Sequence, residues 1–187
     1  KAFSPKTRVV LFNNPLNPTA TIFSPADLDL LAAFCNRYDA IALCDEVWEQ
    51  VVFDGHRHVS LLGRPDMRER TVKIASAGKI FSLTGWKVGL VMAAPAIMRV
   101  LAKAHQYITF TTPPNLQTAV AYGLGKQDDY FEGMRADFQN SRDRFAAGLR
   151  DLGFAVLPSA GAYFLNLDIA PLGETDDVDF CRRLVME

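Results

Sequence analysis

The sequence predicts an α/β protein with a parallel β-sheet and crossover helices. Short apolar runs typical of buried strands alternate with longer segments in which apolar residues recur at helical spacing. Polar residues that could take part in chemistry follow the ends of three of these runs, and an open parallel sheet gathers its ligands at that edge. With 187 residues, of which 49% are hydrophobic, the chain is large enough to bury a substantial core.

The first part of the chain supplies most of the predicted sheet. The expected strands are Arg8–Asn13, Ala40–Cys44, Val72–Ser76 and Val88–Ala93. A helix is expected between the first two strands, because Ser24 fits its N-cap, Pro25 its first turn and Asp27 the positive end of its dipole. This order of elements is typical of a sheet whose strands are joined by crossover helices.

The second part of the chain is mainly helical. Helices are predicted over Pro95–Ile108, Leu116–Gly123 and Asp128–Leu152, with a last one from Asp176 onward. Two strands are expected before that last helix, at Phe154–Leu157 and Tyr163–Leu167. We interpret residues 128–152 as a connecting helix between a first domain over residues 1–127 and the start of a second over residues 153–187.

Charge and cysteine content exclude several classes of function. A formal net charge of −1, with scattered Lys and Arg, gives no electrostatic basis for binding nucleic acid or an anionic membrane. The three cysteines are too few and too far apart for a disulfide framework or a zinc site, and reduced thiols are typical of a cytoplasmic protein. His56 and His58 lie in a polar turn, where we expect solvation rather than metal binding. No run has the length of a transmembrane helix.

Three polar residues at strand ends form the candidate site. Lys79 follows a β-rich run among small residues, so its amine can reach into a cleft and condense with an aldehyde such as pyridoxal 5′-phosphate (PLP). Asp45 ends an apolar strand, where a carboxylate is costly unless a cation pairs with it. Asn17 lies between two prolines in a rigid turn. Each residue also has a purely structural alternative. Lys79 could be an exposed loop lysine, Asp45 could cap the following turn, and Asn17 could only initiate a turn.

Three ordered motifs resemble those of the PLP-dependent aminotransferases of class I and II, which have fold type I. The motifs are Asn14–Thr19 (NPLNPT), Cys44–Trp48 (CDEVW) and Ser76–Gly89 (SAGKIFSLTGWKVG). The resemblance runs from Val9 to Leu167 and implies the C-terminal part of the large parallel-sheet domain, followed by the start of the small α+β domain. Because the chain lacks an initiator Met and ends within a helical pattern, we expect it to be part of a longer protein.

The resemblance implies a role for each candidate residue. Lys79 would hold PLP covalently and then move the substrate proton as a general base and acid. Asp45 would pair with the protonated pyridine nitrogen, and Asn17 would hydrogen-bond the cofactor's 3′-oxygen. Ser76 and Lys87 would bind the cofactor phosphate. A surface lysine remains the alternative interpretation of Lys87.

At three positions the chain departs from the family pattern. Trp48 stands where relatives most often have tyrosine, so its indole either donates a hydrogen bond to the cofactor or only packs against it. Lys87 stands where many relatives have arginine. Lysine offers a point charge to a phosphate, whereas arginine can bind it with two parallel hydrogen bonds. Ala20 follows Asn-Pro-Thr, where glycine is usual, and is strained if the turn requires a positive φ.

The resemblance implies transfer of an amino group between an amino acid and a 2-oxo acid, in a ping-pong cycle between PLP and pyridoxamine phosphate. The motifs look closest to the branch of kynurenine/glutamine-type and methionine aminotransferases. A PLP-dependent carbon–sulfur β-lyase and a PLP-sensing transcription regulator with an aminotransferase-like domain are the alternatives. The expected partners are amino acid and 2-oxo acid substrates and a second copy in a homodimer. The sequence does not indicate which amino acid is used.

Overall fold

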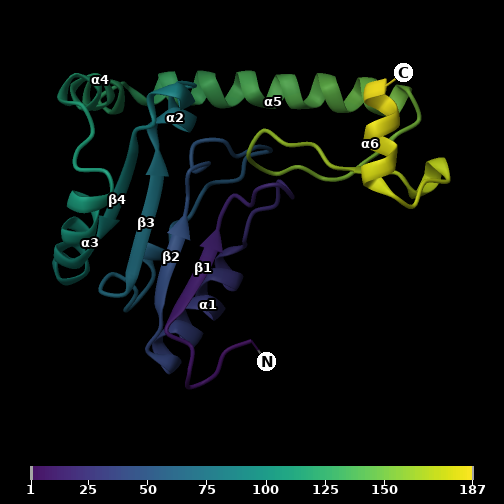
Figure 1. Cartoon of the computed structure of the whole chain (residues 1–187). Helices are drawn as coiled ribbons and strands as arrows, with labels where there is room; N and C mark the ends of the chain where they lie inside the picture. The colour runs from purple at the N-terminus through teal and green to yellow at the C-terminus, as the bar shows by residue number, and fades with distance from the viewer. Residues whose placement is uncertain (1, 187) are drawn as a thin grey trace.

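The computed structural model describes residues 2–186 and places a four-stranded sheet at the centre of the first part of the chain (Figure 1). The strands are β1 (Val9–Asn13), β2 (Ile41–Asp45), β3 (Thr71–Ser76) and β4 (Gly89–Ala93), in the spatial order β1-β2-β3-β4. β1, β2 and β3 pair in parallel, which confirms the α/β class with parallel strands. Their carboxyl ends therefore lie at one edge.

The direction of β4 corrects the expectation of a wholly parallel sheet, because β4 pairs with β3 in antiparallel orientation. The connection between them contains only the one-turn helix α2 (Ala77–Ile80) and a 3₁₀ turn at Thr84–Trp86. A parallel crossover must return along the whole sheet, usually with a helix of several turns. The β3–β4 connection instead stays at the carboxyl edge, so the chain turns back alongside β3.

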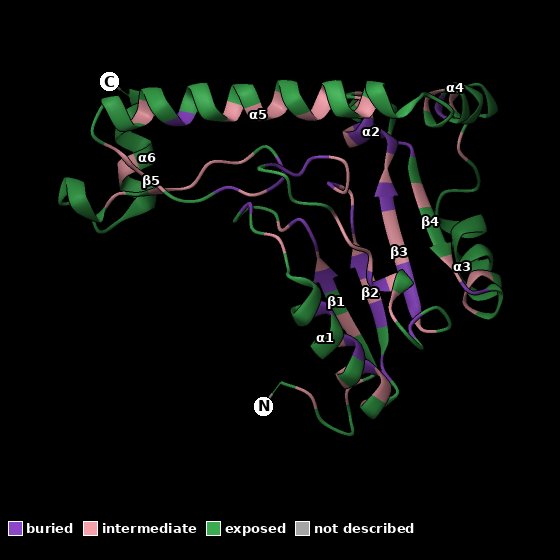
Figure 2. Ribbon diagram, turned by 180° about the vertical axis from the view of Figure 1, so that it is seen from behind, coloured by how far each residue is buried: buried purple, intermediate pink, exposed green. Residues whose placement is uncertain are grey.

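Helix α1 (Pro25–Tyr38) covers one face of the sheet, as Figure 2 shows from behind. Its predicted start is confirmed: the Ser24 hydroxyl accepts from the Asp27 N–H, and the Asp27 carboxylate accepts from the Ser24 N–H. The helix buries a stripe at helical spacing against inward-facing strand residues. The resulting core contains Phe12, Leu28, Ala32, Cys35, Ala42, Cys44, Leu61 and Met67.

Three longer helices follow the sheet. They are α3 (Pro95–Ile108), which has the predicted bounds, α4 (Pro114–Leu124) and α5 (Asp128–Asp151). In Figure 1, α3 and α4 lie beside β4, and α5 lies across the carboxyl edge of the parallel strands. Within residues 2–186, no helix is both long enough and apolar enough to cross a membrane. The placement of α5 puts its side chains next to the loops that leave the sheet.

The last part of the chain forms a small second layer with shorter strands than predicted. β5 (Ala155–Val156) pairs antiparallel with β6 (Leu167–Asp168), and α6 (Asp177–Met186) follows. Of the strand expected at Tyr163–Leu167 only Leu167 lies in a strand, and of the one expected at Phe154–Leu157 only Ala155–Val156 does. The backbone between β5 and β6 bonds instead to the first part of the chain. The N–H groups of Ala160 and Gly161 both donate to the Ala20 carbonyl, at 2.8 and 3.1 Å.

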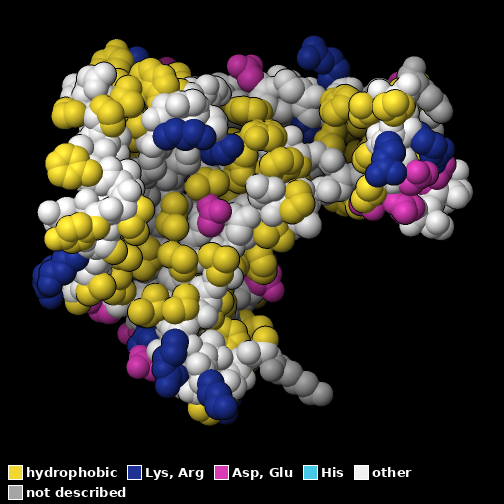
Figure 3. All heavy atoms as spheres, viewed as in Figure 1, with side chains coloured by type: hydrophobic (Ala, Val, Ile, Leu, Met, Phe, Trp, Pro, Cys, Tyr) yellow, Lys and Arg dark blue, Asp and Glu magenta, His cyan; other side chains and the backbone are white. Residues whose placement is uncertain are grey.

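The sheet face opposite α1 presents apolar side chains to the surface. Figure 3 shows hydrophobic atoms gathered over the strands, and Leu11 and Val9 are 75% and 58% exposed. Ile41 and Val91 on neighbouring strands are exposed as well. Strands with apolar residues on both faces are typical of sheets covered on both sides.

Candidate functional site

The carboxyl edge of the sheet brings the candidate residues into neighbouring loops. Asn13 at the end of β1 pairs with Asp45 at the end of β2, and Asp45 pairs with Ile74 near the end of β3. Two residues further along β3, Ser76 leads directly into α2, which contains Lys79. Parallel pairing alone therefore places these side chains at a common edge.

Lys79 is half-buried, and its ammonium lies against aromatic rings. Its Nζ atom is 4.8 Å from the centre of the Trp48 ring and 5.5 Å from that of Tyr163. The two rings contact each other edge-on, with centroids 4.3 Å apart. Trp48 is only 2% exposed. This arrangement ties the lysine to the loop after Asp45, holds the ammonium by cation–π attraction and limits water around it.

The turn that presents Lys79 is closed by tight backbone contacts. The Gly78 carbonyl accepts from the Leu83 N–H at 3.0 Å and from the Thr84 hydroxyl at 3.2 Å. A Cβ added to Gly78 would lie 2.9 Å from the Thr84 Cα, which is closer than Cβ contacts normally come. Glycine is therefore needed immediately before Lys79 because the chain packs back on itself there.

Asp45 is partly buried, and its side chain caps the following turn, which is the structural role considered for it from the sequence. One carboxylate oxygen accepts from the Val47 N–H at 3.3 Å. The Asp45 main-chain carbonyl accepts from two groups at the end of β1 and just beyond it, the Asn13 side-chain amide at 2.9 Å and the Asn14 N–H at 3.0 Å. The backbone that carries the carboxylate is therefore fixed to the neighbouring strand, and a turn role does not exclude binding a cation.

Asn17 lies in an exposed turn that is held from within. Its N–H donates to the Asn13 side-chain oxygen at 2.7 Å, and the Ala20 N–H donates to the Leu16 carbonyl at 2.9 Å. Ala20 is fully buried with a φ of 59°, so the turn does require the left-handed conformation that alanine adopts reluctantly. The turn thus keeps its shape despite the alanine.

Ser76 and Lys87 lie on either side of the β3–β4 connection. Ser76 pairs with Gly89, and the Ala77 N–H donates to the Val88 carbonyl at 3.1 Å. Lys87 is exposed and ends the 3₁₀ turn with a φ of 56°. These pairings bring a hydroxyl and an ammonium to the same stretch of the edge.

Sequence reasoning missed a buried charge cluster centred on Glu46, which is fully buried. Its carboxylate accepts from the Ser60 hydroxyl at 2.9 Å, lies 2.8 Å from His58 Nε2 and lies 3.3 Å from Lys73 Nζ. Lys73 also pairs with Glu49. The expectation that His58 is solvated is therefore wrong: its side chain is 10% exposed, because it pairs with a carboxylate twelve positions earlier.

Glu46 and Lys73 keep their charges despite burial. Burial acts to raise the pKa of Glu46, but the His58 hydrogen bond, the charges of His58 and Lys73 and the Ser60 hydroxyl outweigh it and lower that pKa. Burial also acts to lower the pKa of Lys73, but Glu49 and Glu46 raise it overall. Ligand atoms of Glu46, Glu49 and His58 lie within 4.8 Å of one another, as in a metal site. The Lys73 ammonium contacts both carboxylates and supplies the compensating positive charge, which favours an ion-pair cluster.

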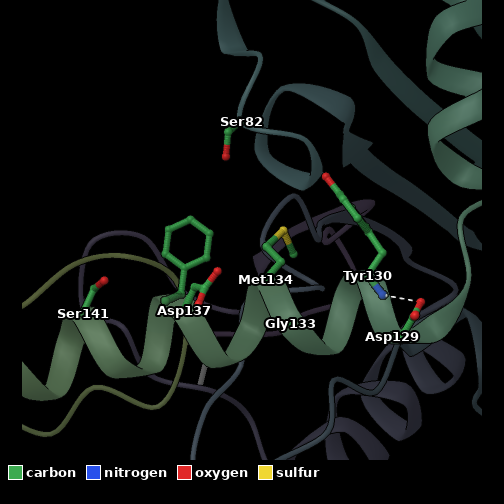
Figure 4. A pocket seen from close by; sticks show the side chains of 8 residues that line it. Ser82, Asp129, Tyr130, Gly133, Met134, Asp137 and Ser141 are labelled. Carbon is green, nitrogen blue, oxygen red and sulfur yellow. Dashed lines mark hydrogen bonds between the residues drawn. The ribbon is translucent and has the colours of Figure 1, made fainter.

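A cavity of about 560 Å³ lies beside α5, and Lys79 is not among the residues that line it (Figure 4). Ser82, from the loop after α2, faces a row of α5 side chains that includes Tyr130, Met134 and Asp137. Met134 also packs against the buried core that contains Trp48. Met134 therefore connects the lining of this cavity to the core that contains Trp48, whose ring contacts Lys79.

The chain is similar to known proteins over its whole length. The family model described as aminotransferase class I and II matches residues 1–187. The chain is 39% identical over 184 residues to the probable N-succinyldiaminopimelate aminotransferase of Mycobacterium tuberculosis, which covers 98% of this chain and 46% of that protein. The solved structure of N-succinyldiaminopimelate aminotransferase from that organism superposes with a TM-score of 0.96 at 38% identity, over 100% of this chain and 48% of that one.

Two further relatives have related names. The chain is 39% identical over 175 residues to kynurenine–oxoglutarate transaminase 1 of Rattus norvegicus, covering 90% of this chain and 41% of that protein. It is 35% identical over 184 residues to the methionine aminotransferase of Escherichia coli, covering 98% and 48%. The chain thus spans about half the length of the curated relatives that it matches.

Proposed function

The chain belongs to the aminotransferase class I and II family, and from this membership we infer that the whole protein moves an amino group between an amino acid and a 2-oxo acid with PLP. The α/β fold is that of fold type I, as the sequence predicted. The observation that supports the proposal most strongly is the common edge at which Asp45, Lys79 and the Asn17 turn meet. The relatives' names do not favour the β-lyase or regulator alternatives.

The chemistry of the side chains at this edge fits PLP. A half-buried primary amine at Lys79 suits its aldehyde carbon, and the Asp45 carboxylate suits a protonated ring nitrogen. The Asn17 amide suits the 3′-oxygen, while the Ser76 hydroxyl and the Lys87 ammonium suit a phosphate. Each functional group of the cofactor therefore has a chemically suitable partner at one edge of the sheet.

When bound, PLP supplies an electron-accepting ring that stabilises negative charge developing at the substrate's α-carbon. Lys79 Nζ would take the proton from the substrate's α-carbon as a general base and then, as a general acid, give it to the carbon that carried the cofactor's aldehyde. The Asp45 carboxylate would pair with the protonated ring nitrogen and so keep the ring electron-accepting. Trp48 and Tyr163 restrict the lysine to one sector and limit water around it, because their rings flank Nζ. In this proposal Trp48 acts by packing rather than by donating a proton.

The proposal also covers the oligomeric state, location and domain boundaries of the whole protein. We propose a homodimer, supported by exposed apolar side chains near the end of α3, where Tyr107 and Ile108 are 87% and 82% exposed. We further propose a cytoplasmic location, supported by three free cysteines in residues 2–186. Residues 1–127 would belong to the large domain, 128–152 to the connecting helix and 153–187 to the small domain.

The Asp45→Ala variant of the whole protein tests the proposed activity. We expect kcat/KM for an amino donor to fall by roughly 10³-fold or more, because the lost ion pair matters most as charge develops on the ring. Absorbance changes of the bound cofactor on adding the donor measure the half-reaction. Asp29→Ala is the matched control, since Asp29 lies on the surface of α1 with a side chain that is 60% exposed. Near-normal rates in Asp45→Ala with PLP still bound would leave Asp45 as a turn residue only.

A further inference from the structure

We propose that Asn13 is a positioning residue that joins the Asn17 turn to the end of β2 and so sets the spacing between Asn17 and Asp45. The inference rests on the proposed function, because it concerns how two proposed cofactor-binding residues are held relative to each other. It concerns a side chain outside the three motifs, at the last position of β1. Asn13 itself has no assigned contact with cofactor or substrate.

Both ends of the Asn13 amide are used, each toward a different proposed site residue. The side-chain oxygen accepts from the Asn17 N–H at 2.7 Å, and the side-chain nitrogen donates to the Asp45 carbonyl at 2.9 Å. The partners fix the orientation of the amide, because an N–H needs an acceptor and a carbonyl needs a donor. Only a side chain with one acceptor and one donor at this spacing satisfies both contacts.

The sheet explains why this position can serve as a bridge. Asn13 and Asp45 are register partners at the ends of adjacent parallel strands, so their main chains cannot shift relative to each other without breaking the sheet. The Asn17 turn lies beyond the end of β1 and is exposed. Without the Asn13 amide, the Asn17 N–H would lose this acceptor, and the Asp45 carbonyl would retain only its bond from the Asn14 N–H.

Two other side-chain hydrogen bonds hold the segment around the Asn17 turn, and neither involves Asp45, so they are useful comparisons. The Asn14 side-chain oxygen accepts from the Phe23 N–H at 3.1 Å, and the Asn166 side chain donates to the Pro18 carbonyl at 2.9 Å. Asn166→Ala therefore removes a side-chain bond to the same turn, of similar length, and leaves the link to Asp45 intact. Any effect of Asn13 on the relative position of Asn17 and Asp45 should be absent in Asn166→Ala.

The test compares Asn13→Ala, Asn13→Asp and Asn166→Ala in the whole protein loaded with PLP. Three quantities are measured: the dissociation constant of PLP, the pH dependence of the bound cofactor's absorption spectrum, and kcat and KM for an amino donor. The free energy of unfolding of the cofactor-free form is measured alongside. Asn13→Asp keeps an acceptor for the Asn17 N–H but places a carboxylate oxygen against the Asp45 carbonyl, so it breaks only the link to β2.

We expect both Asn13 variants to raise the dissociation constant of PLP by about tenfold and to lower kcat by roughly ten- to a hundredfold, the range for losing one or two hydrogen bonds. The spectral pH profile should move in both, and in Asn166→Ala it should match the wild type. Should Asn13→Ala not fold, Asn13→Asp decides the question. An unmoved profile with wild-type PLP binding in the Asn13 variants, or an equal change in Asn166→Ala, would overturn the inference. If the wild type binds no PLP, the proposed function fails instead.

Discussion

Replacing Glu46 with glutamine is expected to lower the free energy of unfolding of the whole protein by about 3 kcal/mol. The change removes the negative charge at the centre of the buried cluster while preserving the size of the side chain. The amide oxygen can still accept from the Ser60 hydroxyl, which donates to Glu46 at 2.9 Å. The charge-based contacts with His58 Nε2 at 2.8 Å and Lys73 Nζ at 3.3 Å are lost or weakened.

The magnitude follows from the burial of all three side chains. The side chains of Glu46, His58 and Lys73 are 0%, 10% and 13% exposed, so little water is available to replace a missing partner. Breaking a buried ion pair typically costs about 3–5 kcal/mol. The lower end applies because Glu49 still pairs with Lys73 in the variant.

The pH dependence of this difference has a definite sign. The pKa of Glu46 is lowered in the folded state from its ordinary value of 4.5. Its stabilising contribution is therefore complete above pH 4.5 and is lost as the pH falls through the lower, folded-state pKa. The difference in unfolding free energy between wild type and Glu46→Gln should therefore be larger at pH values above 4.5 than below it.

Urea denaturation across this pH range measures the effect, with Asp39→Asn as the matched control. Asp39 pairs with Arg70 at 3.0 Å, but its side chain is 94% exposed, so its loss should cost no more than about 1 kcal/mol. Asparagine also tolerates the left-handed backbone of Asp39, whose φ is 50°. A Glu46→Gln protein whose stability loss matches that of Asp39→Asn, or persists unchanged well below pH 4.5, would refute this reasoning.

Two further predictions concern the turn before Lys79 and the start of α1. Gly78→Ala should destabilise the protein by about 1–3 kcal/mol because its Cβ would lie 2.9 Å from the Thr84 Cα. Gly85→Ala, with nothing within 4 Å of its Cβ, should retain stability or gain up to about 1 kcal/mol; equal urea midpoints would contradict this. Ser24→Ala should cost about 1 kcal/mol by removing the capping contact with the Asp27 N–H, and an unchanged midpoint would count against that cap.

Elements governed by local chemistry could be predicted from the sequence. The start of α1 follows from Ser24 and Asp27, which cap their own helix, and α3 has the predicted bounds of Pro95–Ile108. The direction of β4 depends on the short path of the β3–β4 connection, which strand propensity does not encode. The expected strand from Tyr163 depends on pairing between distant segments, and the backbone just before Tyr163 bonds to the Ala20 carbonyl while its ring packs against Trp48.

Part of the candidate site could likewise be predicted from the sequence, and part could not. The motif residues could be chosen from the sequence because each follows a recognisable strand end, and their chemical roles remain predictions. Glu46 and His58 looked like polar turn residues, since nothing local shows that Lys73 on a neighbouring strand completes their cluster. Asn13 looked like an ordinary strand end because its two partners, Asn17 and Asp45, meet it only after the strands pair.

Identification of the lysine that reacts with PLP tests the central claim most directly. The whole protein is incubated with PLP, reduced with borohydride and digested, and the modified peptide is located by mass spectrometry. We predict the label on Lys79, and no specific label in a Lys79→Ala variant, because Lys79 presents a half-buried amine at the carboxyl edge beside Trp48. A specific label on Lys73 or Lys87 with Lys79 unmodified would contradict the assignment of the site.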